Sequence, residues 1–410
     1  MISEIKQRIT QLNNGEVPNG YKKTEFGVFP CDWVTDKRLK DIGTFGKGKG
    51  LPGGKMISEG VPCVGYGDIY MKYNNFHFEK AESFVDEETA SESQPIQKGT
   101  LLFTGTGETA EEIGKCVCYN GDETIYAGGD IITFISNEVK PLFLAYQQYQ
   151  DFSLRNKASF GQGHSVVHIH ADNLEKLNVA YPKSADEQSK IAEILMKWDE
   201  AIELYNQYIE KLKQLKSIWL KKMFPKKGER VPEWRFKGFT DAWEQRKLGE
   251  LVDVCSGRDY KHLSEGTIPV YGTGGYMLSV NDALSYDRDA IGIGRKGTID
   301  KPYILKAPFW TVDTLFYAIP REKVDLNFAF DIFQNIDWKK KDESTGVPSL
   351  SKTAINDIDV LEPKHGEQQT IGQFFAGIDH LITLHQCKVE KIKAQQKVLQ
   401  KYLLNGIVRV

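Results

Sequence analysis

Several features that would assign a function class are missing from this sequence. It has no apolar run of about 18 residues, so no membrane-spanning helix is expected. No Pro-Pro dipeptide occurs, which excludes the acidic-or-Asn Pro-Pro-aromatic motif of a DNA methyltransferase. No GxxxxGK followed by Ser or Thr is present, which excludes a P-loop. The six cysteines never form a Cys-x-x-Cys pair, which indicates reduced thiols in the cytoplasm.

An excess of basic residues is also missing. The chain has 53 Lys and Arg against 56 Asp and Glu, a formal net charge of −3. A protein that binds nucleic acid alone is usually basic, so a DNA-binding role here must depend on local patches or on a partner that supplies positive charge. The charged N-terminus, MISEIKQRITQL, has no apolar core segment, and no signal peptide is expected.

The most informative feature present is an internal repeat. DEQSKIAEILMKWDEAIEL at 186–204 returns as GEQQTIGQFFAGIDHLITL at 366–384, an offset of 180 residues. Over 187–224 and 367–404, ten of 38 positions are identical. A chain of 410 residues is expected to form two or three domains.

Apolar residues in both copies follow steps of four and three, the spacing of a coiled-coil seam. A polar residue, Lys216 or Gln396, breaks each seam at the same place, and we expect Lys216 to lie opposite Gln396 and to set the register of two paired helices. The predicted seam residues are Ile191, Leu195, Trp198, Ile202, Ile209, Leu212 and Trp219 in the first copy, and Ile371, Phe375, Ile378, Ile382, Val389, Ile392 and Leu399 in the second.

The ends of both helices are also readable. Ser184 and Glu187 predict a capping box before the first helix, and Gly406 predicts the cap that ends the second. At ~1.5 Å per residue such a helix is roughly 57 Å long. The alternative is two unrelated amphipathic helices, each packed on its own domain; the shared phase, polar breaks and Glu-Gln start argue against it.

The segments before the two helices repeat more faintly and have the pattern of α/β domains with many short strands. Each has a Trp near its start, a strand led by Pro, a Gly-rich turn, and a closing strand followed by Pro. The N-terminal stripe of Ile2, Ile5, Ile9 and Leu12 is followed by GEVP, which echoes GERVP after the first long helix. This pattern predicts that the N-terminal helix packs near the end of the second long helix.

This order resembles the specificity (S) subunit of Type I restriction–modification enzymes, a host-defence system, and the resemblance covers essentially the whole chain. The segments that carry it are GYKKTEFGVFPCDW, WEQRKLGEL, PVYGTGGYM, GRKGTIDKP, FWTVDTLFY and the two Pro-to-Gln entries into the long helices. The resemblance implies an α/β fold with two target-recognition domains and two helices that form an antiparallel coiled coil. The expected divisions are an N-terminal helix at 1–20, recognition domain 1 at 21–185, spacer helix 1 at 186–225, a connector with recognition domain 2 at 226–365, and spacer helix 2 with the tail at 366–410.

The resemblance further implies a non-enzymatic subunit that recognises double-stranded DNA, each domain reading one half of an asymmetric split target. Two methyltransferase subunits would dock mainly on the long helices, and restriction (translocase) subunits would complete the enzyme. S-adenosylmethionine, ATP and Mg²⁺ are expected on those partners, and no cofactor or metal on this chain. The alternative from another class is a coiled-coil scaffold that joins proteins without touching DNA. A fragment of a fused restriction–methylation enzyme is disfavoured by the missing methylase motif.

Candidate DNA contacts lie in Gly-rich turns with basic or aromatic side chains, where the backbone can approach DNA closely. Arg suits base reading because its fork matches guanine. For each such cation, a solvated surface position is the competing interpretation, and for each Tyr a place in the core. The candidates are Lys47, Lys49, Lys55, Gln162 and His164 in the first domain, and Arg258, Lys261, His262, Tyr271, Tyr276, Arg295, Lys296 and Lys301 in the second.

Three weaker patterns concern a dinucleotide site, a metal site and a cysteine pair. GIGRKG at 292–297 fits GxGxxG, but Pro302 and a strand-like segment follow it in place of a helix, so a dinucleotide site is rejected. HSVVHIH at 164–170 puts imidazoles on one strand, yet no Cys or carboxylate cluster of known metal spacing accompanies it. Cys116 and Cys118 alternate along a strand that we expect to be half-buried.

Overall fold

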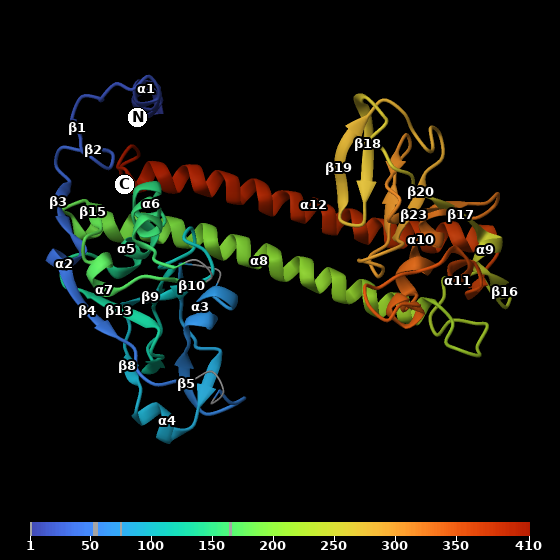
Figure 1. The fold of residues 1–410 in the computed structure, drawn as a ribbon, viewed down its shortest axis with the longest axis horizontal. Coiled ribbons are helices and arrows are strands. Elements are labelled where there is room, and N and C mark those ends of the chain that lie inside the picture. The colour runs from blue at the N-terminus through green and yellow to red at the C-terminus, as the bar shows by residue number, and fades with distance from the viewer. Residues whose placement is uncertain (1, 52–55, 74–75, 164–165) are drawn as a thin grey trace. The chain divides into compact units, whose positions relative to one another are not determined.

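The computed structural model describes residues 2–51, 56–73, 76–163 and 166–410. The chain divides into two compact units, which we call the first unit (Met1–Leu204 with Val389–Val410) and the second unit (Tyr205–Lys388). Two long helices, α8 (Ala185–Met223) and α12 (His365–Leu404), each contribute to both units (Figure 1). Each unit therefore contains the start of one long helix and the end of the other.

The first unit is an α/β fold built on two mixed sheets. Its five-stranded sheet has the order β4-β13-β9-β11-β6, and its four-stranded sheet has the order β7-β5-β12-β8. The strands are β1 (Tyr21–Lys23), β2 (Val28–Pro30), β3 (Val34–Arg38), β4 (Gly43–Lys47), β5 (Val61–Val64), β6 (His77–Phe78), β7 (Ser83–Val85), β8 (Gln94–Ile96), β9 (Thr100–Thr104), β10 (Thr106–Gly107), β11 (Cys116–Tyr119), β12 (Ile125–Ala127), β13 (Ile131–Ser136), β14 (Val167–His168) and β15 (Asn178–Tyr181). The helices are α1 (Ile2–Asn13), α2 (Leu39–Ile42), α3 (Tyr66–Met71), α4 (Glu87–Ser91), α5 (Pro141–Gln147), α6 (Asp151–Phe160) and α7 (Ala171–Leu174).

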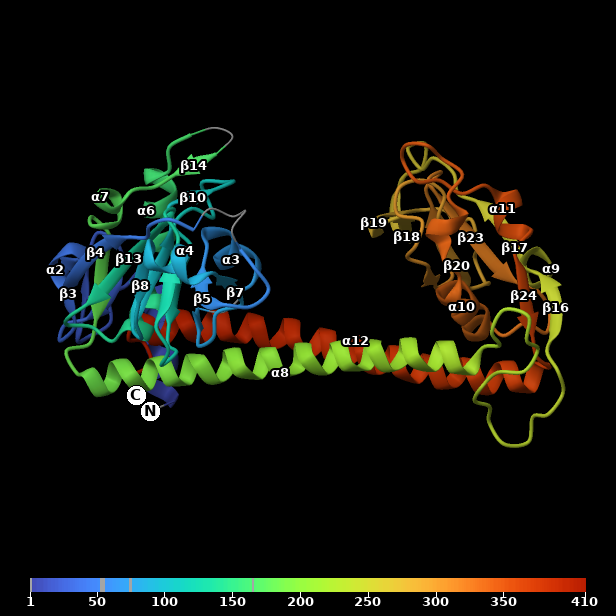
Figure 2. The same cartoon turned by 90° about the horizontal axis from the view of Figure 1, so that it is seen from below.

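The second unit repeats this plan with fewer strands. A four-stranded sheet has the order β17-β23-β20-β21, and a three-stranded sheet has the order β19-β18-β22. In Figures 1 and 2, α10 lies between the four-stranded sheet and the long helices of this unit. The strands are β16 (Glu244–Lys247), β17 (Val252–Ser256), β18 (Glu265–Gly272), β19 (Gly275–Val280), β20 (Ala290–Gly294), β21 (Tyr303–Leu305), β22 (Trp310–Thr311), β23 (Leu315–Pro320) and β24 (Asp359–Glu362), and the shorter helices are α9 (Leu248–Leu251), α10 (Leu326–Asn335) and α11 (Lys352–Asn356).

The main core of each unit includes side chains from both long helices. In the first unit, Ile191 and Leu195 of α8 and Leu403 of α12 pack in one buried cluster with the sheet. In the second unit, Ile371 and Phe375 of α12 join the equivalent cluster with the last turn of α8. The predicted α/β class with a paired set of long helices is confirmed, because these helices are structural parts of both cores.

The predicted seam residues are all buried or half-buried along α8 and α12. The polar breaks are paired differently from the prediction. Lys216 Nζ lies 2.5 Å from Asp379 Oδ2, and Gln396 Nε2 donates to Asp199 Oδ1 at 2.5 Å. The expectation that Lys216 lies opposite Gln396 is therefore wrong. Each of these two residues meets an aspartate of the other helix, which lies 17 residues, or roughly 25 Å along that helix, from the expected partner.

These pairs also give the direction of the helices. In the second unit, the Tyr208 ring packs edge-on against His385, and Lys216 forms an ion pair with Asp379. Residue numbers therefore increase along α8 in the direction in which they decrease along α12. In the first unit, Asp199 meets Gln396 while Glu187 meets Arg409, which gives the same sense. The predicted antiparallel pairing is confirmed within each unit.

The N-terminal segment contacts the residues just after α12, as the sequence predicted. Arg8 of α1 donates to the Ile407 carbonyl at 3.2 Å, and Tyr21 donates to the Gly406 carbonyl at 2.6 Å. Gly406 has φ +65°, the left-handed conformation that glycine favours at a helix C-terminus. The predicted cap is confirmed.

Two smaller predictions were only partly right. The Ser184 hydroxyl accepts from the Glu187 backbone N–H at 3.3 Å, but the Glu187 carboxylate accepts from Arg409, so the reciprocal half of the capping box is replaced by an ion pair. Cys116 and Cys118 are buried along with the whole of β11, because this strand is covered on both faces, and the half-buried expectation is wrong. In the described part of the chain no helix is long and apolar enough to cross a membrane.

Candidate functional site

Three candidate residues of the second unit, Arg258, Tyr271 and Arg295, are hydrogen-bonded to one turn, Trp310–Leu315. Its backbone carbonyls accept from two separate segments: the Arg258 N–H donates to the Thr311 carbonyl at 2.9 Å, and the Arg295 N–H donates to the Thr314 carbonyl at 2.8 Å. The carbonyl of Tyr271 in turn accepts from the Val312 N–H at 3.0 Å. This turn therefore brings together residues that are up to 37 positions apart in the sequence (295 and 258).

The loop carrying Arg258, Lys261 and His262 is held by an aromatic ring. Trp310 Nε1 donates to the Arg258 carbonyl at 2.9 Å, and the His262 ring packs edge-on against Trp310 at 5.8 Å. All three predicted side chains are exposed. Lys261 also lines an open groove beside Tyr276 and Met277 of the β18–β19 hairpin.

The two candidate tyrosines have different roles. Tyr271 is half-buried, contacts the Tyr303 ring at 6.1 Å and packs against the small core of the three-stranded sheet. Tyr276 is 63% exposed at the tip of the hairpin. Of the pair, only Tyr276 offers its ring to a ligand, whereas Tyr271 supports the sheet beneath the turn.

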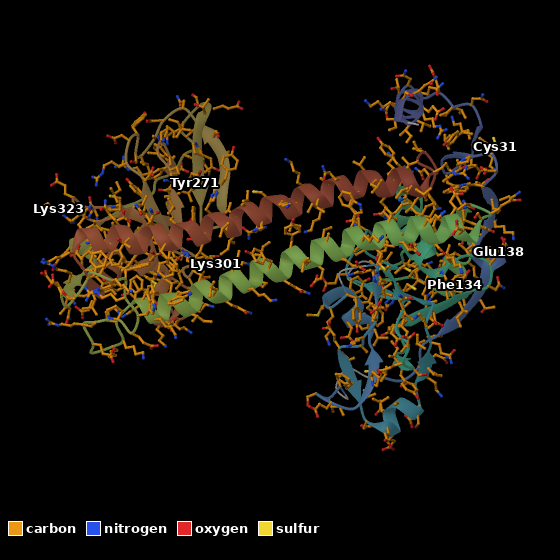
Figure 3. The ribbon with its side chains drawn as sticks, turned by 180° about the vertical axis from the view of Figure 1, so that it is seen from behind. Cys31, Phe134, Glu138, Tyr271, Lys301 and Lys323 are labelled. Carbon is orange, nitrogen blue, oxygen red and sulfur yellow. The ribbon has the colours of Figure 1, made fainter. Side chains whose placement is uncertain are left out.

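The stretch GRKGTIDK does not act as a single patch. Arg295 and Lys296 lie at the end of β20 and line a surface hollow with Glu343 and Ser349. Lys301 lies beside α8, where it lines another hollow with Lys213 and Asp337, away from the sheet residue Tyr271 (Figure 3). Lys301 therefore lines a different hollow from the two cations that precede it.

The candidate residues of the first unit also lie in turns that backbone hydrogen bonds hold in place. Lys49 is exposed, and its N–H donates to the Ala127 carbonyl at 3.1 Å; Lys47 ends β4 and is exposed too. Gln162 is exposed and its backbone exchanges hydrogen bonds with His168. Lys55 and His164 lie outside the described residues.

Two residues that the sequence analysis did not select as DNA contacts also lie beside Gln162. Thr106 and His168 face each other across the short β10–β14 pair, with Thr106 Oγ1 3.3 Å from His168 Nδ1. The carbonyl of Gly105, just before β10, accepts from the Ile169 N–H at 3.0 Å. Two-residue strands leave almost no periodic signal, so only the repeat itself could have identified these residues.

The first unit also contains a buried lysine. Lys157 of α6 is 1% exposed, and its ammonium donates to the Gly114 carbonyl at 2.9 Å. Burial lowers the pKa of Lys157 to about 8. Among the described residues no carboxylate forms an ion pair with Lys157, so its charged form is stabilised mainly by one carbonyl and by the Tyr149 ring, whose centroid lies 5.4 Å away.

Each unit also has a buried polar cluster where a short helix meets the long ones. In the first unit, Tyr146 of α5 donates to Asp199 Oδ2 at 2.5 Å while Gln396 donates to Oδ1. Burial raises the pKa of Asp199, although both hydrogen bonds act in the opposite direction. In the second unit, the corresponding groups are Asp331 of α10, Asp379 and Lys216. Burial raises the pKa of Asp331 well above its usual range, and the Lys216 charge opposes that rise.

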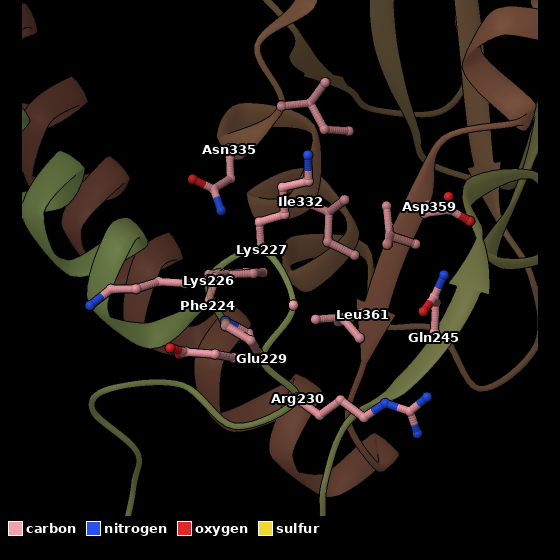
Figure 4. A pocket seen from close by; sticks show the side chains of 14 residues that line it. Phe224, Lys226, Lys227, Glu229, Arg230, Gln245, Ile332, Asn335, Asp359 and Leu361 are labelled. Carbon is pink, nitrogen blue, oxygen red and sulfur yellow. The ribbon is translucent and has the colours of Figure 1, made fainter.

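A pocket of ≈ 480 Å³ lies beneath the segment that follows α8 (Figure 4). Phe224, Ile332 and Leu361 form an apolar floor, and Lys226 and Arg230 lie at its rim. None of the DNA-contact residues predicted for this fully described unit is in its lining. The candidate DNA surface and the pocket are therefore separate features.

Comparison with known proteins points to one family. The family model described as "Type I restriction modification DNA specificity domain" matches the chain twice, over residues 30–214 and 240–394. The chain is 24% identical to the putative type I restriction enzyme MjaX specificity subunit of Methanocaldococcus jannaschii, over 95% of this chain and 97% of that protein. It is 25% identical to the MjaVIII specificity subunit of the same organism, over 64% of this chain and 70% of that protein.

Solved structures share the fold. The S subunit of a Type I restriction–modification system from M. genitalium matches with a TM-score of 0.61 at 17% identity, over 95% of this chain and 97% of that one. A chain from a study of complex assembly and conformational transition of the type I restriction–modification system matches with a TM-score of 0.53 at 13% identity, over 96% and 100%.

Proposed function

Because the chain belongs to the Type I restriction modification DNA specificity family, we propose that it is the DNA-recognition subunit of a Type I restriction–modification complex. Each unit reads one half of an asymmetric, bipartite target in double-stranded DNA. The observation that carries this proposal is the double match of the family model to two segments with unlike sequences. Two similar folds with different surface residues suit two different half-sites.

The long helices set the distance between the half-sites. Half-sites one turn of B-DNA apart lie ~34–36 Å from centre to centre. The 39 residues of α8 span roughly 58 Å, which is long enough for such a separation. Since the α8 and α12 residues are parts of the cores of both units, the spacing depends on helix length.

The same helices provide the docking surface for two methyltransferase subunits. Besides the seam, α8 carries a second apolar stripe whose members remain exposed: Tyr208 at 44%, Leu215 at 44% and Ile218 at 52%. On α12, Leu381 and Leu384 are 40% and 52% exposed. Exposed apolar residues in a row on a long helix favour packing by helices of another protein.

The chain itself is proposed to be non-catalytic. S-adenosylmethionine binds the methyltransferase subunits, ATP and Mg²⁺ serve the restriction (translocase) subunits, and the complex works on DNA in the cytoplasm. The net charge of −3 supports a division of labour in which the partners neutralise most phosphates.

A gel-shift series tests this proposal. A duplex with the target should bind the chain weakly alone and tightly with the methyltransferase subunit, and the affinity of the complex should fall steeply between 50 and 200 mM salt, on the order of 10³-fold. Equal affinity with and without the methyltransferase would contradict the division of labour. A stable protein complex that never methylates DNA would favour the scaffold alternative.

A further inference from the structure

We propose that Arg258 and Arg295 read guanine in the half-site of the second unit, at an edge that the first unit repeats with different residues. This inference rests on the proposed function and assigns base-reading residues to it. We call the two edges recognition edges. Each consists of a Gly-basic turn (Gly48-Lys49 or Gly257-Arg258), the two residues that follow β9 or β20, and the residue that pairs with the second of these two.

The backbone frames of the two recognition edges are equivalent bond by bond. Gly48 N–H donates to Ile131 at 2.8 Å in the first unit, and Gly257 N–H donates to Leu315 at 3.1 Å in the second. The next residue also has the same bond in each unit: Lys49 donates to Ala127, and Arg258 donates to Thr311. Lys49 and Arg258 therefore occupy the same position.

The central strand gives the second equivalence. Gly105 N–H, after β9, donates to Asp130 at 2.8 Å, and Arg295 N–H, after β20, donates to Thr314 at 2.8 Å. The two carbonyls of the same residues then accept from Ile169 and Leu350, respectively. Gly105 and Arg295 therefore occupy one position.

The next residue in each unit, Thr106 or Lys296, gives a third equivalent position. Thr106 pairs with His168 in the first unit, and Lys296 pairs with Ser349 in the second. All four are exposed or half-exposed. Both edges thus present a pair of side chains from two segments at the same place.

Both frames depend on a close approach of backbone at the same glycine. A Cβ on Gly48 would lie 1.8 Å from the Gly128 carbonyl oxygen, and a Cβ on Gly257 would lie 2.0 Å from the Val312 carbonyl oxygen. Only glycine fits at either position. Because both turns need glycine at this position, the backbone at Lys49 and at Arg258 is held in the same way.

The chemistry on the two frames is different. The second unit presents Arg258, Arg295 and Lys296, whereas the first presents Lys49 and the neutral pair Gly105 and Thr106. Arginine is the side chain whose two parallel donors match guanine O6 and N7. The second edge, with two arginines, is therefore better suited to guanine than the first, which has one lysine.

An acidic neighbour separates base reading from phosphate binding. Asp313 is exposed on the turn between the two arginines, and its carbonyl lies 3.5 Å from Arg295 Nη1. A carboxylate repels phosphate but accepts a hydrogen bond from cytosine N4, the partner of guanine. The edge is therefore expected to face base edges in the major groove.

The test is a methylation map of host DNA after co-expression of the full chain with its methyltransferase subunit. The variant Arg258→Lys/Arg295→Lys keeps both charges and loses both forks. We expect one half-site to become degenerate at its guanine positions, with discrimination reduced ~10-fold or more, and the other half-site to stay unchanged. Arg321→Lys is the matched control, because Arg321 is exposed just beyond the far end of β23.

The outcomes separate the inference from the function on which it rests. No split motif with the wild-type chain would contradict the proposed function itself. A split motif that the double variant leaves unchanged would overturn the inference alone. Loss of all methylation in the double variant, with normal thermal unfolding and with the control active, would place both arginines on phosphates and would also overturn it.

Discussion

The substitution Lys216→Gln tests whether the buried polar cluster of the second unit is a charge-balanced unit. The Lys216 ammonium lies 2.5 Å from Asp379 and 5.5 Å from the centroid of the Phe330 ring. Asp331 is 1% exposed, and its Oδ2 atom is buried without a hydrogen-bond partner in the described structure. The substitution leaves two aspartates close together without a cation.

The expected cost follows from the burial of these groups. Breaking a buried ion pair by removing one partner costs ~3–5 kcal/mol. The Asp379 side chain is 34% exposed, so solvent screens part of the loss and we take about 3 kcal/mol, the lower end of that range. For a unit of about 180 residues this corresponds to a fall in Tm of roughly 6–12 °C.

The assay is calorimetric unfolding of the full chain, with a rescue variant. Lys216→Gln/Asp331→Asn should recover most of the loss, because a glutamine then donates to a single aspartate as Gln396 does to Asp199 in the first unit. A cost below about 1 kcal/mol for Lys216→Gln, less than a typical buried hydrogen bond, would refute the reasoning. Failure of Asp331→Asn to rescue would show that Asp331 is not part of the cluster.

Three further predictions follow from other contacts. Lys157→Met should be more stable than wild type at pH 7, because burial disfavours the charged form of Lys157 in the folded state. As pH rises from about 8 to 10.5, Lys157 loses its proton in the folded state, the free energy of unfolding of the wild type rises, and the difference between the two proteins should shrink. A difference in urea unfolding that does not depend on pH would contradict this prediction. Arg235→Ala should destabilise the second unit by about 3 kcal/mol, since it leaves the 2%-exposed Glu367 carboxylate unpaired, and Arg235→Ala/Glu367→Gln should recover part of this in the same assay. Inserting one heptad into each of α8 and α12 should lengthen the spacer of the methylated motif by ~3 base pairs without changing the half-sites, and changed half-site bases would contradict the spacing role.

The sequence predicted the long helices well because their seams are long and regular. Steps of four and three over ten turns identify the buried face, and the matching start at Glu187 and Glu367 identifies the repeat. The seam pattern does not determine which residue of α8 lies opposite which residue of α12. Two antiparallel helices that carry the same repeat place equivalent residues opposite each other at one level only. Lys216 and Gln396 do not lie at that level, so each faces an aspartate.

The recognition edges were predicted only in part because their strands are very short. Gly48-Lys49 and Gly257-Arg258 stand out as basic residues in glycine turns, and the sequence selected both. Thr106 and Ser349 carry no such composition signal, and His168 stood out only in a weak metal pattern. Their positions are set by backbone hydrogen bonds between segments far apart in the chain. Lys301 was grouped with Arg295 by nearness in sequence, but the structure places it beside α8.

The central claim is that two unlike readers on paired helices recognise one split DNA sequence. The most direct test is a genome-wide methylation map of cells that express the full chain with its methyltransferase subunit, in a host without other methylation. The account predicts a motif with two different half-sites separated by a spacer of fixed length. A continuous motif, a symmetric motif, or a stable complex that leaves the DNA unmethylated would contradict it.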